Sequence, residues 1–274
     1  NLIVIMIKKD GLLCKKEIIN SLREDALELL SKIEIKEQTN STNDDARESL
    51  KNSSNILSAH FAEQQSAGRG RNSRKWISPF GKNIYLSLAW QSDLSFADIE
   101  GLSLAIGVEI AESLKKNTDE VIEIKWPNDL LINQKKLGGI LIETSSGKKG
   151  NLEIIIGIGI NVFMKNEDAI EIDQDWTSLE NYKNRSLDRN LIAANLLNNL
   201  VQLTTKFKTV GFGGYKEAFE NRNVLMNKDC EVLANGIVDY HGSVVGINDK
   251  GELLIKRNNE IINLRYGEVS IREL

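Results

Sequence analysis

Short apolar runs alternate with polar turns through most of the chain, and their lengths predict an α/β body. The run at 152–163 is apolar at nearly every position, which predicts a strand buried on both faces. Two runs around the polar turn at 133–135 predict a hairpin. The predicted strands of the body are 33–36, 56–62, 83–91, 121–125, 130–132, 136–144 and 152–163.

Apolar residues at helical spacing lie between these strands and predict helices. Ser21-Leu-Arg-Glu24 has the pattern of a capping box, and Ser41 or Thr42 and then Asp188 are suited to cap the helices that follow them. The predicted helices are 22–33, 43–51, 95–116, 189–206 and 213–221. Residues 164–187 are polar and irregular, and Trp176 is predicted to be their main anchor.

The two ends of the chain have a different pattern. Residues 2–7 and 12–16 predict a hairpin turning at Asp10-Gly11. After Arg222, short strands separated by Asn and Gly turns predict a small all-β barrel. These strands are 230–234, 236–240, 243–247, 252–256, 261–266 and 269–271. We therefore divide the chain into an N-terminal hairpin (1–20), a body (21–221) and a C-terminal barrel (222–274).

Composition excludes several classes of protein. Two cysteines and two histidines argue against a disulfide framework and a zinc site, and fit a reducing, cytoplasmic compartment. The apolar run at 2–7 is too short to span a membrane. The net charge of -4 argues against nonspecific nucleic-acid binding. We find no Ser–His–Asp or Cys–His set and no phosphate-binding P-loop motif.

The strongest candidate for chemistry is a basic loop, residues 65–76, with the sequence Q-S-A-G-R-G-R-N-S-R-K-W. Its four cations, in an acidic chain, lie beside two glycines that free the backbone. Guanidinium groups and exposed backbone N–H groups bind carboxylates and phosphates. The pattern favours an anion site over a merely solvated loop.

Three further clusters accompany this loop: Ser41-Thr42-Asn43, residues 125–136 and residues 157–161. The G-I-G-I-N at 157–161 lacks the third glycine and the helix of a dinucleotide fingerprint, so its glycines indicate close approach of another group. The remaining chemistry consists of cations, amides and one candidate metal-binding carboxylate, Asp129. Such a set suits reactions in which charge builds on phosphate oxygens. Considered alone, Lys136 is more typical of a solvated turn lysine.

Five segments together resemble the bacterial biotin–protein ligase family. They are S-T-N at 41–43, the basic loop, K-W-P-N-D-L at 125–130, K-K-L-G-G-I-L-I-E at 135–143 and G-I-G-I-N at 157–161. N-R-N-V at 221–224 and G-E-V-S-I-R at 267–272 resemble the small C-terminal domain of the family. The resemblance implies an α+β fold: a class II synthetase-like mixed sheet flanked by helices, with an SH3-like barrel.

The resemblance also implies site residues and their roles. The residues that it implies for biotin binding are Ser41, Thr42, Asn43, Gln65, Arg69, Gly70, Arg71 and Lys136. The catalytic positions are Lys136, Arg69, Arg71 and Asp129, with Asp129 also suited to Mg²⁺. ATP or the adenylate would contact Lys125, Asn128, Asn161, Trp176, Glu268 and Arg272.

The implied reaction activates biotin with ATP and Mg²⁺ to biotinyl-5′-AMP. Biotin then passes to a lysine of a biotin carboxyl carrier protein. A homodimer is compatible with the family, and DNA is not an expected partner because the segment before Ser41 is too short for a complete winged helix-turn-helix. Two alternatives stay open: a biotin-responsive regulator whose DNA-binding domain is missing from this chain, and a lipoate ligase on the same fold.

Overall fold

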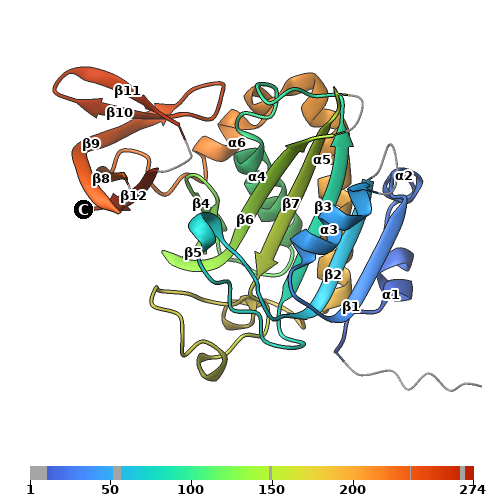
Figure 1. Ribbon diagram of the computed structural model, residues 1–274. Helices are drawn as coiled ribbons and strands as arrows, with labels where there is room; N and C mark the ends of the chain where they lie inside the picture. The colour runs from blue at the N-terminus through green and yellow to red at the C-terminus, as the bar shows by residue number, and fades with distance from the viewer. Residues whose placement is uncertain (1–10, 52–56, 148–149, 235, 266–268) are drawn as a thin grey trace, which may run out of the picture.

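A seven-stranded mixed sheet forms the centre of the protein (Figure 1). The structure is a computed structural model and describes residues 11–51, 57–147, 150–234, 236–265 and 269–274. The strand order is β1-β2-β3-β7-β6-β5-β4, with β1 parallel to β2 and the other neighbours antiparallel. The strands are β1 (Lys32–Thr39), β2 (Leu57–Gln65), β3 (Ile84–Ser92), β4 (Glu123–Lys125), β5 (Asp129–Ile132), β6 (Lys135–Ser146) and β7 (Leu152–Ile160).

Helices cover both faces of this sheet. On one face, α3 (Thr42–Lys51) packs Ala46 and Leu50 on Ala89 and Ile155. On the other face, α4 (Leu102–Leu114) and α5 (Arg189–Val210) pack in the main core. Successive residues of a strand point to opposite faces, so β7 is apolar almost throughout, as predicted.

The N-terminal segment differs from the sequence prediction. Residues 2–7 lie outside the described residues, and the predicted strand at 12–16 is wrong, because α1 begins within it (Lys15–Asn20). The predicted helix over 22–33 is shortened to α2 (Glu24–Leu29), and β1 follows. The Ser21 capping box does not form, because the N–H of Ser21 bonds back to Ile18 to end α1.

Contacts with α5 decide this arrangement. The side-chain oxygen of Asn190 accepts from the N–H of Cys14 at 2.7 Å, and that of Asn198 accepts from the N–H of Arg23 at 2.9 Å. Both bonds join residues more than a hundred positions apart, so local periodicity could not have predicted them. The predicted Asp188 cap of α5 is confirmed, since its side chain accepts from Asn190 and Leu191.

The predicted start of the helix at residue 95 is also wrong. Ser95 bonds to Asp98 in a separate turn, and α4 begins at Leu102 after Gly101, whose φ is 74°. A Cβ on Gly101 would lie 2.6 Å from the ring of Phe212. Close packing at Gly101 and its positive φ therefore separate the turn from the helix.

A second, five-stranded antiparallel sheet forms the C-terminal part of the chain, beside α6 (Lys216–Glu220) and β4 in Figure 1. Its order is β11-β10-β9-β8-β12. The strands are β8 (Asp229–Ala234), β9 (Ile237–Ile247), β10 (Leu253–Arg257), β11 (Glu260–Leu264) and β12 (Val269–Glu273). The two strands predicted over 236–247 are one continuous strand, β9, with irregular register against both neighbours.

The two sheets meet through backbone and side-chain contacts. Trp126 Nε1 donates to the carbonyl of Gly251 at 3.1 Å, and a Cβ on Gly251 would lie 2.7 Å from the Cα of Gly101. The connection between the sheets holds η5 (Phe212–Tyr215) and α6 (Lys216–Glu220), where one helix was predicted. Within the described part of the chain, no helix is both long and apolar enough to cross a membrane.

Candidate functional site

All four sequence clusters line one cavity of about 760 Å³. The residues of the central sheet in it come from β2, β4, β5, β6 and β7. Others come from α3, the basic loop, the turn at 126–128, residues 171–176 and the C-terminal sheet. The predicted site residues in its lining are Ser41, Thr42, Asn43, Gln65, Arg69, Gly70, Arg71, Lys125, Asn128, Asp129, Lys136, Asn161, Trp176 and Arg272. The remaining one, Glu268, lies outside the described residues.

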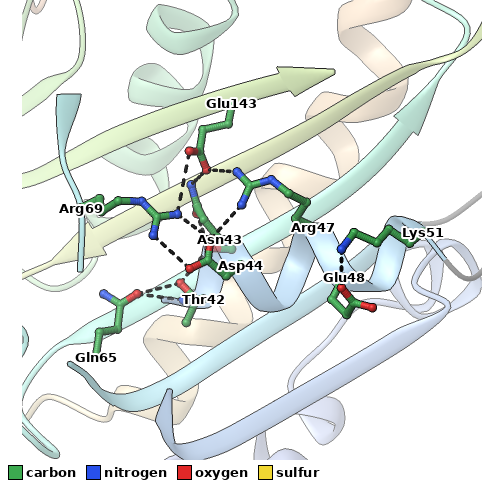
Figure 2. A network of polar contacts seen from close by, with 10 residues as sticks. Thr42, Asn43, Asp44, Arg47, Glu48, Lys51, Gln65, Arg69 and Glu143 are labelled. Carbon is green, nitrogen blue, oxygen red and sulfur yellow. Dashed lines mark hydrogen bonds and ion pairs between the residues drawn. The ribbon is translucent and has the colours of Figure 1, made fainter. Parts of the chain in front are cut away.

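One end of the cavity is built from buried neutral groups. Ser41, Thr42 and Asn43 are only 3–4% exposed. Gln65 Oε1 accepts from the backbone N–H and the hydroxyl of Thr42, at 2.9 and 3.2 Å, and Gln65 Nε2 donates to Ser78 at 3.1 Å. These bonds fix the orientation of the Gln65 amide at the end of β2 (Figure 2).

The amide of Asn43 is oriented by two residues that the sequence analysis did not single out. Its Oδ1 accepts from Ser87 Oγ at 2.6 Å, and its Nδ2 donates to Glu143 Oε2 at 2.6 Å. Ser87 is fully buried on β3 and also lies 2.7 Å from Thr42 Oγ1. A serine in the middle of the apolar run at 83–91 was the signal that could have identified Ser87.

The glycines of G-I-G-I-N leave space for side chains that pack directly on β7. A Cβ on Gly157 would lie 2.3 Å from Asn43 Oδ1, and one on Gly159 would lie 2.5 Å from the ring of Trp76. The interpretation of these glycines as points of close approach is therefore confirmed. Trp76 also lines the cavity, with its ring against Gly159 and 5.6 Å from Lys136 Nζ.

The basic loop is closed by its own backbone. The N–H of Gly70 donates to Arg74 at 2.7 Å, and the N–H of Trp76 donates to Gly68 at 2.9 Å. A Cβ on Gly68 would lie 2.6 Å from the carbonyl oxygen of Trp76, so this closure requires a glycine. Arg71 Nη1 reaches Asn128 Oδ1 at 3.4 Å.

Arg69 makes a two-pronged ion pair with Asp44 on α3 (Figure 2). Its Nη1 and Nη2 lie 3.0 and 2.6 Å from the two carboxylate oxygens. The Arg69 guanidinium holds the pKa of the Asp44 carboxyl below its usual range, and Asp44 in turn raises the pKa of Arg69. Both groups are therefore charged at neutral pH.

The other end of the cavity is charged. Lys136 Nζ lies 2.9 Å from Asp129 Oδ1 and 5.6 Å from the centre of the Trp76 ring. The predicted hairpin is confirmed, because antiparallel pairing of β5 and β6 brings these residues together. At 17% exposure the Lys136 side chain is not the solvated turn lysine that its sequence context favours.

The remaining predicted residues approach this charged end from several elements. Asn128 Nδ2 donates to Ile140 at 2.8 Å, and Asn161 Nδ2 donates to Thr177 at 3.0 Å. Trp176 forms a backbone bridge with Lys136, which ties the irregular segment to β6. Arg272 reaches the cavity from β12, with its Nη1 3.8 Å from Glu231.

Neither histidine belongs to the site. His60 is buried on β2 with its Nε2 3.0 Å from Ser58 Oγ, and burial lowers its pKa. His241 is exposed on β9. Among the residues that the structure describes, no three His, Cys, Asp or Glu side chains group together to hold a metal ion.

Comparison with known proteins gives the family. The biotin/lipoate A/B protein ligase family matches residues 35–161, and the biotin protein ligase C-terminal domain matches residues 226–272. The bifunctional ligase/repressor BirA of Escherichia coli is 38% identical over 215 residues, which span 78% of this chain and 66% of that protein. The biotin–[acetyl-CoA-carboxylase] ligase of Mycobacterium tuberculosis is 29% identical over 86% of this chain and 88% of its own length.

Solved structures agree with these matches. The biotin protein ligase of Aquifex aeolicus, in complex with biotin and ATP, superimposes with a TM-score of 0.75 at 30% identity. The superposition covers 89% of this chain and all of that one. On its sequence segments, its fold and these comparisons, the chain belongs to the biotin protein ligase family.

Proposed function

We propose that this protein activates biotin with ATP to biotinyl-5′-AMP and transfers the biotin to a lysine of a carrier protein. One observation supports the proposal: buried neutral side chains and cationic side chains line the same cavity, together with Trp76. The similar protein from Aquifex aeolicus has been solved with biotin and ATP, the two substrates that this reaction needs.

The neutral end suits the ureido group of biotin. A cyclic urea offers one carbonyl acceptor and two N–H donors, and the oriented groups of Ser41, Thr42, Asn43 and Gln65 can match both kinds. Gln65 bonds to Thr42, and Thr42 and Asn43 both contact Ser87, so little reorganisation of these three residues is needed on binding. Trp76 offers an apolar surface to the remainder of the biotin ring.

The charged end suits attack of the biotin carboxylate on the α-phosphate. The obstacle is repulsion between two anions, and cations placed around them lower it. We assign this role to Lys136, Arg69 and Arg71. A phosphate oxygen can replace the Asp129 carboxylate on Lys136, so the ammonium group always has a partner. The C–O–P bond forms as pyrophosphate leaves.

The donor set fits Mg²⁺ only as an ion that arrives with ATP. Mg²⁺ is usually held by one or two carboxylates together with substrate phosphates. Asp129 is the carboxylate that we assign to it, because it lies in the cavity beside Asn128 and opposite Lys125 in the β4–β5 pairing. When bound, the ion would neutralise charge on the phosphates.

Transfer then requires a neutral lysine amine on the carrier, which attacks the carbonyl of the adenylate and releases AMP. The basic loop would cover the mixed anhydride and slow its hydrolysis. We assign the nucleotide to Lys125, Asn128, Asn161, Trp176 and Arg272, with Glu268 as a further expected contact. A biotin carboxyl carrier protein is the proposed acceptor, the cytoplasm the proposed location and a homodimer the proposed assembly.

The alternatives receive less support. The larger family match covers biotin and lipoate ligases alike, but the C-terminal match is to a domain of biotin protein ligases. The regulator alternative rests on a DNA-binding domain, and nothing in the described residues supports one.

Single-turnover mass spectrometry tests the proposal. The protein is mixed with biotin and MgATP, with no acceptor present. We expect bound biotinyl-5′-AMP, and the same experiment with lipoate is the matched control. Adenylate formed from lipoate and not from biotin would overturn the proposal. Adding a biotin carboxyl carrier domain then tests the second half-reaction, read as a mass increase of the carrier.

A further inference from the structure

Four charged side chains surround Asn43 with alternating sign (Figure 2). Asp44 contacts Arg69 at 2.6 Å and Arg47 at 2.8 Å. Glu143 contacts Arg47 at 2.9 Å and lies 3.9 Å from Arg69. These residues come from α3, the basic loop and β6, so the cluster joins three segments that are distant in sequence.

Asp44 contacts both arginines of this cluster. It is the residue after Asn43 on α3, and Arg47, one turn further, holds one of its carboxylate oxygens. A two-pronged guanidinium–carboxylate pair restricts both side chains more than a single contact does. The Asp44 carboxylate is therefore aimed at Arg69. Gln65 already bonds to Thr42 at the start of the basic loop, and the Arg69–Asp44 pair adds a second contact with α3 further along it.

We propose that Asp44 is a positioning residue. Through Arg69 it holds the basic loop against α3, so that the free protein need not order this loop when it binds its substrates. The inference rests on the proposed function, because the loop is the part that we assign to the biotin carboxylate and the adenylate phosphate. An ordered loop lowers the entropy lost on binding and slows escape of the adenylate.

Two roles for Asp44 predict changes in substrate affinity of opposite sign. If Asp44 merely competed with substrate anions for Arg69, its removal would strengthen binding. If Asp44 positions Arg69, its removal weakens binding. The substitution Asp44→Asn separates these cases, since it removes the charge and keeps the shape. The control is Glu48→Gln, which removes an exposed carboxylate of the same helix that contacts Lys51, away from Arg69 (Figure 2).

Amide hydrogen exchange on the free protein is the first test. The N–H groups of Gly70 and Trp76 are bonded within the basic loop and report its closure. We expect both to exchange about fivefold faster in Asp44→Asn, the loss of one partly exposed ion pair. Glu48→Gln is expected to match the unsubstituted protein. Equal exchange in Asp44→Asn and Glu48→Gln would overturn the proposal.

The second test couples Asp44 to Arg69. We expect Asp44→Asn to weaken biotin binding and to speed adenylate dissociation, each about fivefold. In an Arg69→Ala background the same substitution is expected to have little further effect, because the remaining partner of Asp44, Arg47, lies on α3 itself and not on the basic loop. Tighter binding in Asp44→Asn, or an undiminished effect without Arg69, would contradict the proposal.

These tests also separate this inference from the proposed function. Hydrogen exchange needs no substrate, so it reports on Asp44 even if no adenylate forms. Absence of adenylate in the unsubstituted protein would count against the ligase proposal alone.

Discussion

In one part of the cavity, the uncharged side chains of Thr42, Asn43 and Ser87 are at most 4% exposed and bond to one another, and Asn43 also donates to the Glu143 carboxylate. In another part, the side chains of Lys136 and Asp129 are 17% and 26% exposed and form an ion pair. The first arrangement cannot change without leaving a buried polar group unpaired, which is costly. In the second arrangement, Lys136 can exchange the Asp129 carboxylate for a phosphate oxygen with little change in free energy.

This difference matches the two tasks that the proposed reaction sets. Recognition of a neutral ureido group requires donors and acceptors in fixed positions, since a mismatch leaves polar groups unpaired. Handling of phosphates requires positive charge whose partner can be replaced as charge moves. We therefore expect substitutions at the neutral end to alter biotin affinity and substitutions at the charged end to alter rate or ATP affinity.

The largest effect is expected at Lys136. Lys136→Ala should lower the rate of adenylate formation by about 10²–10³-fold, the usual effect of removing one group that stabilises developing charge. Biotin affinity should fall far less. Rapid-quench kinetics and biotin titration measure the two quantities, and Lys135→Ala, at an exposed neighbour on β6, is the control. Equal losses of rate and affinity would contradict the division between the two ends.

The substitution Gly157→Ala should displace Asn43, one of the neutral groups. The new Cβ would lie 2.3 Å from Asn43 Oδ1, so Asn43 must move. We expect biotin binding to weaken, because a displaced Asn43 no longer presents its amide in the same place, and the free energy of unfolding to fall by about 1–3 kcal/mol, the usual cost of overpacking. Titration calorimetry measures the loss. The control is Gly213→Ala, where a Cβ meets no atom within 4 Å. Unchanged biotin affinity in Gly157→Ala would show that the orientation of Asn43 does not matter.

A smaller effect is expected where the C-terminal sheet meets the charged end. Trp126→Phe removes the N–H that donates to Gly251 and keeps an aromatic ring. Because Arg272 reaches the cavity from this sheet, ATP affinity should fall by about 1 kcal/mol, the contribution of one neutral hydrogen bond. Biotin affinity should stay the same. A loss confined to biotin binding would reverse the assignment of the two ends.

The smallest effect concerns stability outside the cavity. Burial lowers the pKa of His60, so the folded state binds fewer protons than the unfolded state below about pH 6.5. The free energy of unfolding should therefore decrease as pH falls from 6.5. In His60→Gln this part of the slope should disappear, as measured by urea unfolding at several pH values. His241→Gln, at the exposed histidine, is the control, and an equal change of slope in both variants would exclude His60 as the cause.

The sequence allowed much of the body to be predicted, because its strands and the helices over 43–51 and 189–206 have strong local patterns. It failed where long-range bonds replace local ones. The capping box predicted at Ser21 does not form, and Asn190 and Asn198 bond to this segment instead. The helix expected from residue 95 begins later, at Leu102, directly after Gly101, against which Phe212 packs closely.

The site shows the same division. The basic loop, the K-W-P-N-D-L segment and the G-I-G-I-N glycines were recognisable as a sequence, and they indicated both the family and the anion chemistry. Ser87, Asp44 and Glu143 were not recognised as parts of the site, because a serine in a strand and carboxylates on a helix or strand are locally ordinary. Their importance lies entirely in what they contact.

The sequence by itself determined the kinds of chemical group available, the order of the segments that carry them and the family to which they belong. Only the tertiary structure decided that Lys136 pairs with Asp129, that Arg69 pairs with Asp44, and that neutral and charged groups line one cavity. The physical reason is that composition and periodicity depend on neighbours along the chain. A binding site depends instead on distances between side chains that folding brings together from α3, the basic loop and the β5–β6 hairpin.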